Sequence, residues 1–140
     1  MNIFSNQARL INLPVIKDAR GCLSFFEGNN HIPFEIRNTS LLWNQQPGVV
    51  QAGRACMNGG EYLVPLSGTL IVSLHDGYSE WSIIVQHPGQ GLYIPARLWR
   101  EVKNSSHDGV ALIVRAVSLN DAEFVCDLAR FCELVKNNHD

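Results

Sequence analysis

The chain has 140 residues, of which 46% are hydrophobic and 17% are charged, and its formal net charge at pH 7 is −2. This length suits one hydrophobic core, so we expect a single domain spanning residues 1–140. A nearly neutral chain offers no basic surface for nucleic acid or an anionic membrane, and neither is an expected partner. Apolar runs such as 110–114 are too short to span a bilayer, and residues 1–10 lack the pattern of a secretory signal, so we expect a cytoplasmic protein.

Short β-strands separated by turns are expected over most of the chain. Groups of Gly, Pro, Asn and Asp recur every few residues, a pattern typical of an all-β sandwich or barrel. The pair Asp76-Gly77 is the strongest hairpin signal, because it tolerates the positive φ angles of a tight turn. The β body is expected over residues 8–117, with strands at Leu10–Leu13, Cys22–Glu27, Ser40–Trp43, Tyr62–Leu66, Leu70–Leu74, Trp81–Val85, Gly91–Ile94, Trp99–Lys103 and Val110–Val117.

The tail of the chain changes from the strand period to the helical period. Phe124, Leu128 and Phe131 fall on one apolar stripe at helical spacing, and Asn120 suits the N-cap position before them. We therefore expect one C-terminal helix over about residues 120–137, packed on the β body.

Four cysteines show no CxxC pairing in a domain large enough to fold without cross-links. We interpret them as reduced thiols, at Cys22, Cys56, Cys126 and Cys132.

The stretch 51–68 (QAGRACMNGGEYLVPLSG) has the spacing of a site built on two neighbouring strands. Arg54 and Cys56 are two residues apart and so point to the same side of a strand, while Glu61 and Gly68 follow after a turn. Cupin barrels place a metal-binding motif, H-x-H-x(3,4)-E-x(6)-G, at this spacing. Here only the glutamate and the glycine match, and an arginine cation repels a metal, so we expect no metal and no other cofactor.

A series of short motifs extends from about Ile11 to Phe131. They are Asp18-Ala-Arg-Gly21 with Leu23, Ile32-Pro-Phe-Glu-Ile36, Leu63-Val64 and Leu66-Ser-Gly68, Asp76-Gly77, and Gly91-Leu-Tyr93 with Pro95 and Trp99. With these motifs the chain resembles the 3,4-ketoisomerases of nucleotide-linked (dTDP) 4-keto-6-deoxyhexoses, small metal-free cupins of deoxysugar and O-antigen biosynthesis. The resemblance implies an all-β cupin jelly-roll barrel with one C-terminal helix, a sugar or nucleotide sugar as ligand, and a homodimer.

The resemblance also implies that both catalytic histidines are replaced. The family motif reads roughly R-G-x-H-A-H-K-x(3)-Q, and its two histidines correspond to Arg54 and Cys56, with Glu61 at the glutamine. A base for proton transfer between C3 and C4 needs a pKa near neutrality, which Arg54 does not have. One interpretation makes Cys56, activated by Arg54, or Glu61 the replacement base. The other makes Arg54 and Glu61 an inward ion pair beside a buried, inert Cys56.

Further candidate ligand contacts follow from the same resemblance. Arg20 matches a residue at the mouth of the family's pocket, and Arg100 matches a position that affects which product epimer forms. Tyr93 and Trp99 are candidates to stack on a sugar, with burial in the core as the alternative for both. Two more arginines, Arg37 and Arg97, lie next to these family motifs in the sequence. By pattern, none of the five histidines falls at an inward strand position.

The nucleotide end of the family's pocket is altered as well. Basic family positions that help to hold the diphosphate correspond to Asn38, Gln51 and Met57, and aromatic positions correspond to Ser40 and Leu41. Losing cations around a diphosphate weakens binding, because charge-assisted contacts are the strong ones. Gln51 remains a candidate ligand contact, but a thymidine diphosphate sugar is a less favoured ligand than in the family.

Three functional hypotheses remain open. The first is a divergent ketoisomerase-family cupin that binds a sugar or nucleotide sugar, with weak activity or activity rebuilt on Cys56 and Glu61. The second is a non-catalytic cupin that pairs with itself or with an active paralogue. The third is isomerisation or epimerisation of a different sugar. In each case the edge strand Leu10–Leu13 is expected to pair across a dimer interface.

Overall fold

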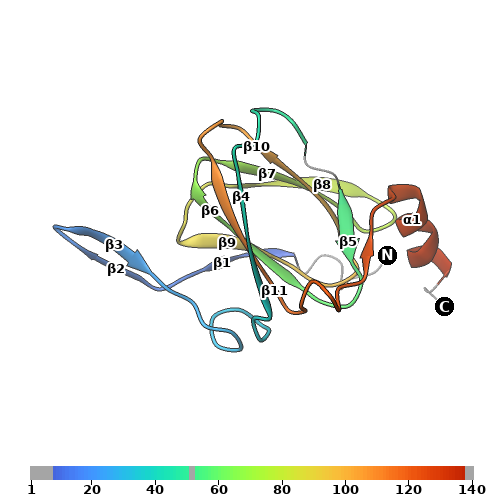
Figure 1. The fold of residues 1–140 in the computed structure, drawn as a ribbon, viewed down its shortest axis with the longest axis horizontal. Coiled ribbons are helices and arrows are strands. Elements are labelled where there is room, and N and C mark those ends of the chain that lie inside the picture. The colour runs from blue at the N-terminus through green and yellow to red at the C-terminus, as the bar shows by residue number, and fades with distance from the viewer. Residues whose placement is uncertain (1–7, 51–52, 138–140) are drawn as a thin grey trace.

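Two five-stranded antiparallel sheets face each other in the computed structural model, which describes residues 8–50 and 53–137 (Figure 1). The first sheet contains, in spatial order, β1 (Arg9–Asn12), β9 (Gln90–Ile94), β6 (Glu61–Ser67), β11 (Val110–Arg115) and β4 (Asn38–Trp43). The second contains β12 (Phe124–Val125), β5 (Arg54–Cys56), β10 (Trp99–Asn104), β7 (Leu70–His75) and β8 (Glu80–Val85). The predicted all-β body is confirmed, although β2 (Val15–Asp18), β5 and β12 were not among the expected strand ranges.

Alternation along the strands separates an inward face from an outward face of each sheet. The space between the sheets is filled mainly by aliphatic side chains, because alternate positions of β6, β7, β9, β10 and β11 are apolar. This core consists of Leu63, Leu70, Val72, Leu74, Val85, Leu92, Ile94, Leu98, Val102, Ala111 and Ile113. A second cluster, which includes Leu13, Ile32, Phe34, Tyr62, Val64 and Val114, covers the outer face of the first sheet.

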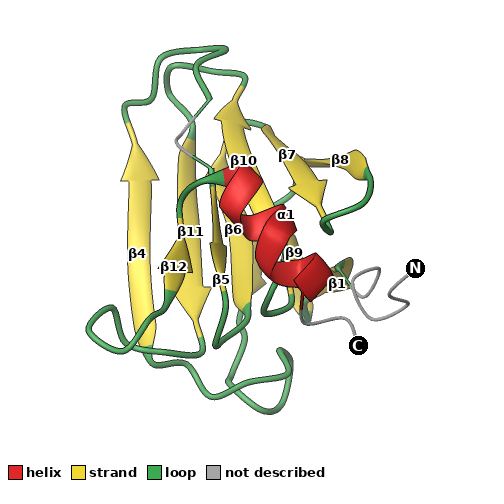
Figure 2. Cartoon of the chain, turned by 90° about the vertical axis from the view of Figure 1, so that its right-hand side faces the viewer, coloured by secondary structure: helices red, strands yellow, loops and turns green. Residues whose placement is uncertain are grey.

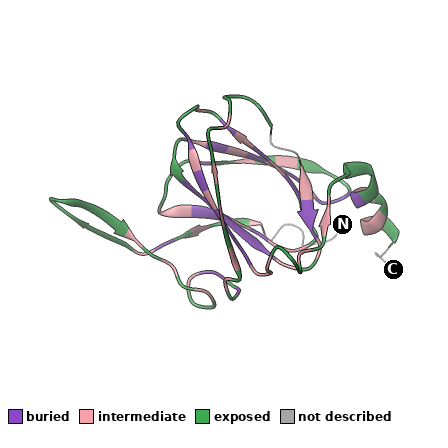
Figure 3. Cartoon of the chain, viewed as in Figure 1, coloured by how far each residue is buried: buried purple, intermediate pink, exposed green. Residues whose placement is uncertain are grey.

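A β-hairpin projects away from the two sheets. It consists of β2 (Val15–Asp18) and β3 (Gly21–Ser24), which pair only with each other among the described strands. Figures 1 and 3 show this arm extending from the body with its surface exposed. The expected strand Cys22–Glu27 is therefore wrong in its bounds. The reason is that β3 pairs only with β2 among the described strands, from Asp18 opposite Gly21 to Val15 opposite Ser24.

Helix α1 (Leu128–Asn137) lies across the second sheet (Figure 2). Its buried side chain Phe131 packs on Ala55 and Trp99, so the helix covers the outer face of β5 and β10. The expected start near residue 120 is wrong: Phe124 belongs to β12, and Asp127 caps the helix by accepting a hydrogen bond from the N–H of Ala129 at 3.1 Å. Within the described residues, no helix has the length and apolar character needed to cross a membrane.

The hairpin of β7 and β8 turns at Asp76-Gly77, as predicted. The φ angle of Gly77 is 100°, and a Cβ there would lie 2.8 Å from Cγ1 of Val135 in α1. Glycine is required for both the turn and the close approach of the helix.

Candidate functional site

Charged side chains converge inside the barrel where four strands begin or end. Arg54 of β5 and Arg100 of β10 are directly opposite each other in the second sheet. Glu61 of β6 and Arg115 of β11 are directly opposite each other in the first sheet. Residues paired in this way point to the same face of their sheet, and alternation places all four on the inward face. We call these four residues the interior charge cluster.

Glu61 bridges the two sheets. Its carboxylate accepts hydrogen bonds from Arg100 Nε at 3.2 Å, Arg100 Nη2 at 3.1 Å and Arg115 Nε at 2.8 Å. The relative exposure is 3% for Glu61, 0% for Arg100 and 1% for Arg115. Charge-assisted hydrogen bonds of this kind are the strong ones, and each partner offsets the cost of burying the others.

Arg115 is a site residue that the sequence did not predict, because it lies outside the stretch 51–68 and outside the family motifs. The signal was present in β11, where Ala111 and Ile113 point inward and the next inward position is an arginine. Arg115 also donates from Nη1 to Asn38 Oδ1 at 2.8 Å and to Ser40 Oγ at 2.9 Å. Asn38 and Ser40 are therefore hydrogen-bonded to the interior charge cluster.

Arg54 differs from the other two arginines in its partners. Its guanidinium carbon lies 4.4 Å from the ring centroid of Phe124, and that of Arg115 lies 5.7 Å from the same ring. Among the residues the structure describes, no group accepts a hydrogen bond from Arg54 Nε. Burial, followed by the nearby charges of Arg100 and Arg115, lowers the pKa of Arg54. The interpretation that pairs Arg54 with Glu61 is therefore wrong, because the carboxylate binds the other two arginines.

The two candidate bases are both poorly suited to accept a proton near neutral pH. Burial raises the pKa of the Cys56 thiol, and its Sγ lies 3.6 Å from Asn58 Oδ1. Burial alone would also raise the pKa of Glu61, but Arg100 and Arg115 outweigh it and hold that pKa below its ordinary value. Cys56 is therefore a neutral thiol and Glu61 a weakly basic carboxylate.

Two aromatic candidates face away from the barrel interior. Trp99 alternates with Arg100 on β10, and its ring packs against Phe131 with centroids 6.0 Å apart. Tyr93 belongs to the cluster on the outer face of the first sheet, where its ring lies 6.3 Å from that of Phe34. Both side chains pack in hydrophobic clusters outside the barrel interior, so neither is a ligand contact there.

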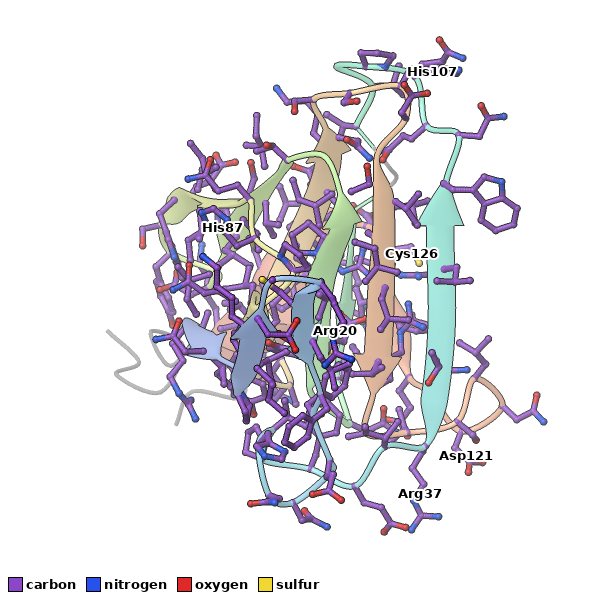
Figure 4. All side chains as sticks on the ribbon, turned by 90° about the vertical axis from the view of Figure 1, so that its left-hand side faces the viewer. Arg20, Arg37, His87, His107, Asp121 and Cys126 are labelled. Atoms are coloured by element: carbon purple, nitrogen blue, oxygen red, sulfur yellow. The ribbon has the colours of Figure 1, made fainter. Side chains whose placement is uncertain are left out.

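The remaining arginine candidates lie outside the cluster. Arg20 is at the tip of the β2–β3 arm, its side chain 91% exposed and bonded to Asp18 (Figure 4). Arg37 is exposed and pairs with Glu35, and its side chain points away from the body in Figure 4. Arg97 is exposed as well. Gln51 lies outside the described residues.

Histidines do not contribute to the cluster in the part of the chain that the structure describes. His75 accepts a hydrogen bond from the main-chain N–H of Gly77 at 2.9 Å, and His31 accepts one from that of Glu27 at 2.9 Å. His87 and His107 lie on peripheral loops (Figure 4). Over residues 8–50 and 53–137, no three His, Cys, Asp or Glu side chains converge on a point that could hold a metal.

Two facing antiparallel sheets with a C-terminal helix, and polar side chains gathered inside where the strands end, define a cupin-type jelly roll. The chain belongs to the FdtA family (WxcM-like, C-terminal), whose model matches residues 6–136. The predicted fold class and family are both confirmed.

Three similar proteins are named as 3,4-ketoisomerases or a 3,4-oxoisomerase. The TDP-4-oxo-6-deoxy-alpha-D-glucose-3,4-oxoisomerase of Aneurinibacillus thermoaerophilus is 27% identical over 117 residues, which cover 84% of each chain. The TDP-quinovose 3,4-ketoisomerase WlaRB of Campylobacter jejuni is 29% identical, with a TM-score of 0.85 over 91% of this chain and 98% of that one. A 3,4-ketoisomerase of Helicobacter canadensis is 28% identical, with a TM-score of 0.88 over 93% and 98% of the two chains.

Proposed function

We propose that this protein binds a nucleotide-linked sugar inside its barrel, in deoxysugar biosynthesis, without carrying out 3,4-ketoisomerisation by its relatives' route. The observation that carries the proposal is the pairing of Glu61 with Arg100 and Arg115. Its relatives' names, two of which specify a TDP-linked sugar, support the ligand class.

Ketoisomerisation moves a proton between adjacent sugar carbons, so it requires a group that can take up and return a proton near neutral pH. At the positions matched to the catalytic histidines, Arg54 remains a cation and Cys56 is a buried thiol with a raised pKa. Glu61 is ionised, but two arginines stabilise the ionised form and so weaken it as a base. The cluster binds and orients charge better than it transfers protons.

The nucleotide end is altered in a way that favours a ligand different from those of the relatives. Asn38 and Ser40 are bonded to Arg115 inside the barrel, and the Oγ of Ser40 donates to Asn38 Oδ1 at 3.0 Å. Neither side chain offers the cation or the aromatic ring expected at its position. We therefore expect a lower affinity for thymidine diphosphate itself than in the relatives.

The exposed arm supports a homodimer. Ile16 and Leu23 pair on one face of the hairpin and are 56% and 59% exposed, and Val15 on the other face is 53% exposed. Exposed apolar patches mark interaction sites. A groove of about 660 Å³ lies between the base of the arm and the first sheet, lined in part by Leu13, Phe26, Leu66 and Leu112. β1 also forms an edge of that sheet. We assign this surface to a second copy, toward whose pocket Arg20 at the arm's tip would project.

The dimer is tested by sedimentation equilibrium of the variant Ile16→Asp. A charge in the interface should convert the dimer to monomer, whereas Ile84→Asp, at a residue that is 58% exposed on β8, should leave the dimer intact. A wild-type protein that is monomeric, or a dimer that tolerates Ile16→Asp, would contradict this assignment.

The catalytic part is tested by incubating the protein with TDP-4-keto-6-deoxyglucose in deuterated buffer. We expect no deuterium incorporation at C3 and no 3-keto product by NMR, with the Aneurinibacillus oxoisomerase as the active control. The double variant Arg54→His, Cys56→His should gain measurable exchange, since it supplies two groups that titrate near neutrality. Wild-type turnover comparable to that of the control enzyme would refute the proposal. Failure of TDP-linked sugars to bind in calorimetry would refute the ligand class.

A further inference from the structure

The interior charge cluster has more positive than negative groups. Three guanidiniums, of Arg54, Arg100 and Arg115, lie around one carboxylate, that of Glu61. Among the described residues, Glu61 is the only carboxylate that forms an ion pair with any of these arginines. With Glu61 ionised, the cluster therefore carries two unbalanced positive charges. Buried charges are normally paired, because an unpaired one loses its hydration without compensation.

Two of the three positive charges lie on directly opposed side chains. Arg54 and Arg100 are direct cross-strand partners and both point inward. Like charges in this arrangement destabilise a sheet pair. Arg100 uses Nε and Nη2 for Glu61, which leaves Nη1 on the other side of its fork. Among the described residues no acceptor meets Arg100 Nη1 or Arg54 Nε, although Arg100 is fully buried.

The free donors are held in place rather than mobile. The Arg54 guanidinium stacks on the Phe124 ring at 4.4 Å, and Glu61 fixes the guanidinium of Arg100 by two hydrogen bonds. A guanidinium fixed in this way binds a planar or tetrahedral oxyanion with little further loss of side-chain entropy. Two such groups from neighbouring strands can share one anion between them.

We propose that Arg54 and Arg100 form an oxyanion-binding site inside the barrel, which takes a carboxylate or phosphate group of the ligand. Arg115, which is hydrogen-bonded to Glu61, adds positive potential. The proposal rests on the proposed function in one respect, namely that the barrel is where the nucleotide sugar binds. The proposal adds that the part of the ligand next to Arg54 is negatively charged. A sugar carboxylate, as in a uronic acid, and the diphosphate are the two sources of such a group.

The test measures binding of four probes by calorimetry at constant ionic strength: inorganic phosphate, glucuronate, TDP-glucose and TDP-glucuronate. The variant Arg54→Gln removes the charge at a half-buried side chain without breaking a bond to Glu61. The variant Arg54→Lys keeps a positive charge but lacks the planar set of guanidinium N–H donors. The control is Arg37→Gln, which neutralises an exposed arginine outside the barrel. Loss of one charge-assisted contact should weaken anion binding by roughly 10- to 100-fold.

The pattern among the probes identifies the source of the anion. If the sugar carboxylate is bound, TDP-glucuronate binds more tightly than TDP-glucose, and Arg54→Gln abolishes the difference. If the diphosphate is bound, the two nucleotide sugars bind alike and both lose affinity in Arg54→Gln. In either case Arg54→Lys recovers part of the loss, and Arg37→Gln behaves as wild type.

A second measurement separates a binding role from a structural one. Without any probe, Arg54→Gln should raise the thermal midpoint, because it removes a cation opposed to Arg100 and Arg115. A lower midpoint combined with weaker binding would assign Arg54 a structural role and overturn the proposal. Unchanged affinity of Arg54→Gln for every probe, or no binding of any probe to the wild type at millimolar concentration, would also overturn it.

These outcomes distinguish this inference from the proposed function. If TDP-glucose binds and Arg54→Gln has no effect, the nucleotide-sugar function is supported and the oxyanion site is refuted. If phosphate or glucuronate binds through Arg54 while the TDP-linked sugars do not bind, the oxyanion site is supported and a nucleotide-linked sugar as ligand is refuted.

Discussion

The bridge made by Glu61 predicts a large loss of stability for the variant Glu61→Gln. The carboxylate accepts three hydrogen bonds, at 2.8, 3.1 and 3.2 Å, from two arginines that are 0% and 1% exposed. An amide carries no charge and presents an NH2 group to one of these donors, so both guanidiniums lose their counterion while remaining buried. Removal of one member of a buried ion pair typically costs about 3–5 kcal/mol, and we expect a loss in this range.

Urea denaturation at neutral pH measures this loss, provided that the slope of the unfolding free energy is unchanged between variants. The matched control is Glu35→Gln, which removes a carboxylate paired with Arg37 at 3.0 Å but with its side chain 64% exposed. Such surface pairs contribute less than about 1 kcal/mol. If Glu61→Gln is no more destabilising than Glu35→Gln, the cluster does not stabilise the fold and the reasoning is refuted.

The same pairing fixes the direction of a pH effect. The pKa of Glu61 is lower in the fold than in the unfolded chain, since Arg100 and Arg115 outweigh the opposing effect of burial. Its contribution is therefore fully present above the unfolded pKa and is lost as the pH falls through the folded pKa. The free energy of unfolding of the wild type should consequently fall more steeply on acidification than that of Glu61→Gln. Parallel profiles would contradict the lowered pKa.

Three further predictions follow from individual contacts. Cys56 should react with iodoacetamide far more slowly than the exposed Cys22 at neutral pH, as followed by mass spectrometry, because burial raises its thiol pKa; equal rates would contradict this. Gly77→Ala should lower the free energy of unfolding in urea by about 1–3 kcal/mol, because φ is 100° and a Cβ would meet Val135 at 2.8 Å; a neutral effect would refute this. Tyr62→Phe should cost about 1–3 kcal/mol in the same assay, because its hydroxyl bonds two main-chain groups at 2.9 and 3.2 Å, and in the wild type its pKa of about 12 should delay phenolate absorbance in an alkaline titration.

The arm carries exposed apolar side chains, as do β4 and β8 in the rest of the β body. In a monomer the arm would present Ile16 and Leu23 to water with nothing to offset the cost of exposure. The adjoining groove is apolar as well. A homodimer that covers both surfaces would bring a second chain close to each barrel, so its ligand site and its assembly would be linked.

Local pattern was enough to predict most of the strands, the main hairpin and the shared face of Arg54 and Cys56. The period of two along a strand determines that Arg54 and Cys56 share a face, and Asp76-Gly77 determines the turn between β7 and β8. These features depend on neighbours within a few residues, which the sequence displays directly. The helix boundary was missed because Phe124 fits both the helical stripe and a strand, and its pairing with β5 decided between them.

The partners of the charged residues were decided only by the tertiary structure. Glu61 binds Arg100 and Arg115, which are 39 and 54 residues away in sequence, and not Arg54, which is the nearest arginine to it in the chain. Alternation specifies the face on which a side chain lies, but not which side chain meets it across the barrel. That choice depends on strand order and on the distance between two sheets, and these arise when the whole chain packs. The sequence therefore determined where the charged residues point, and the packing of the sheets determined that Arg100 and Arg115 bind Glu61 while Arg54 has no carboxylate partner among the described residues.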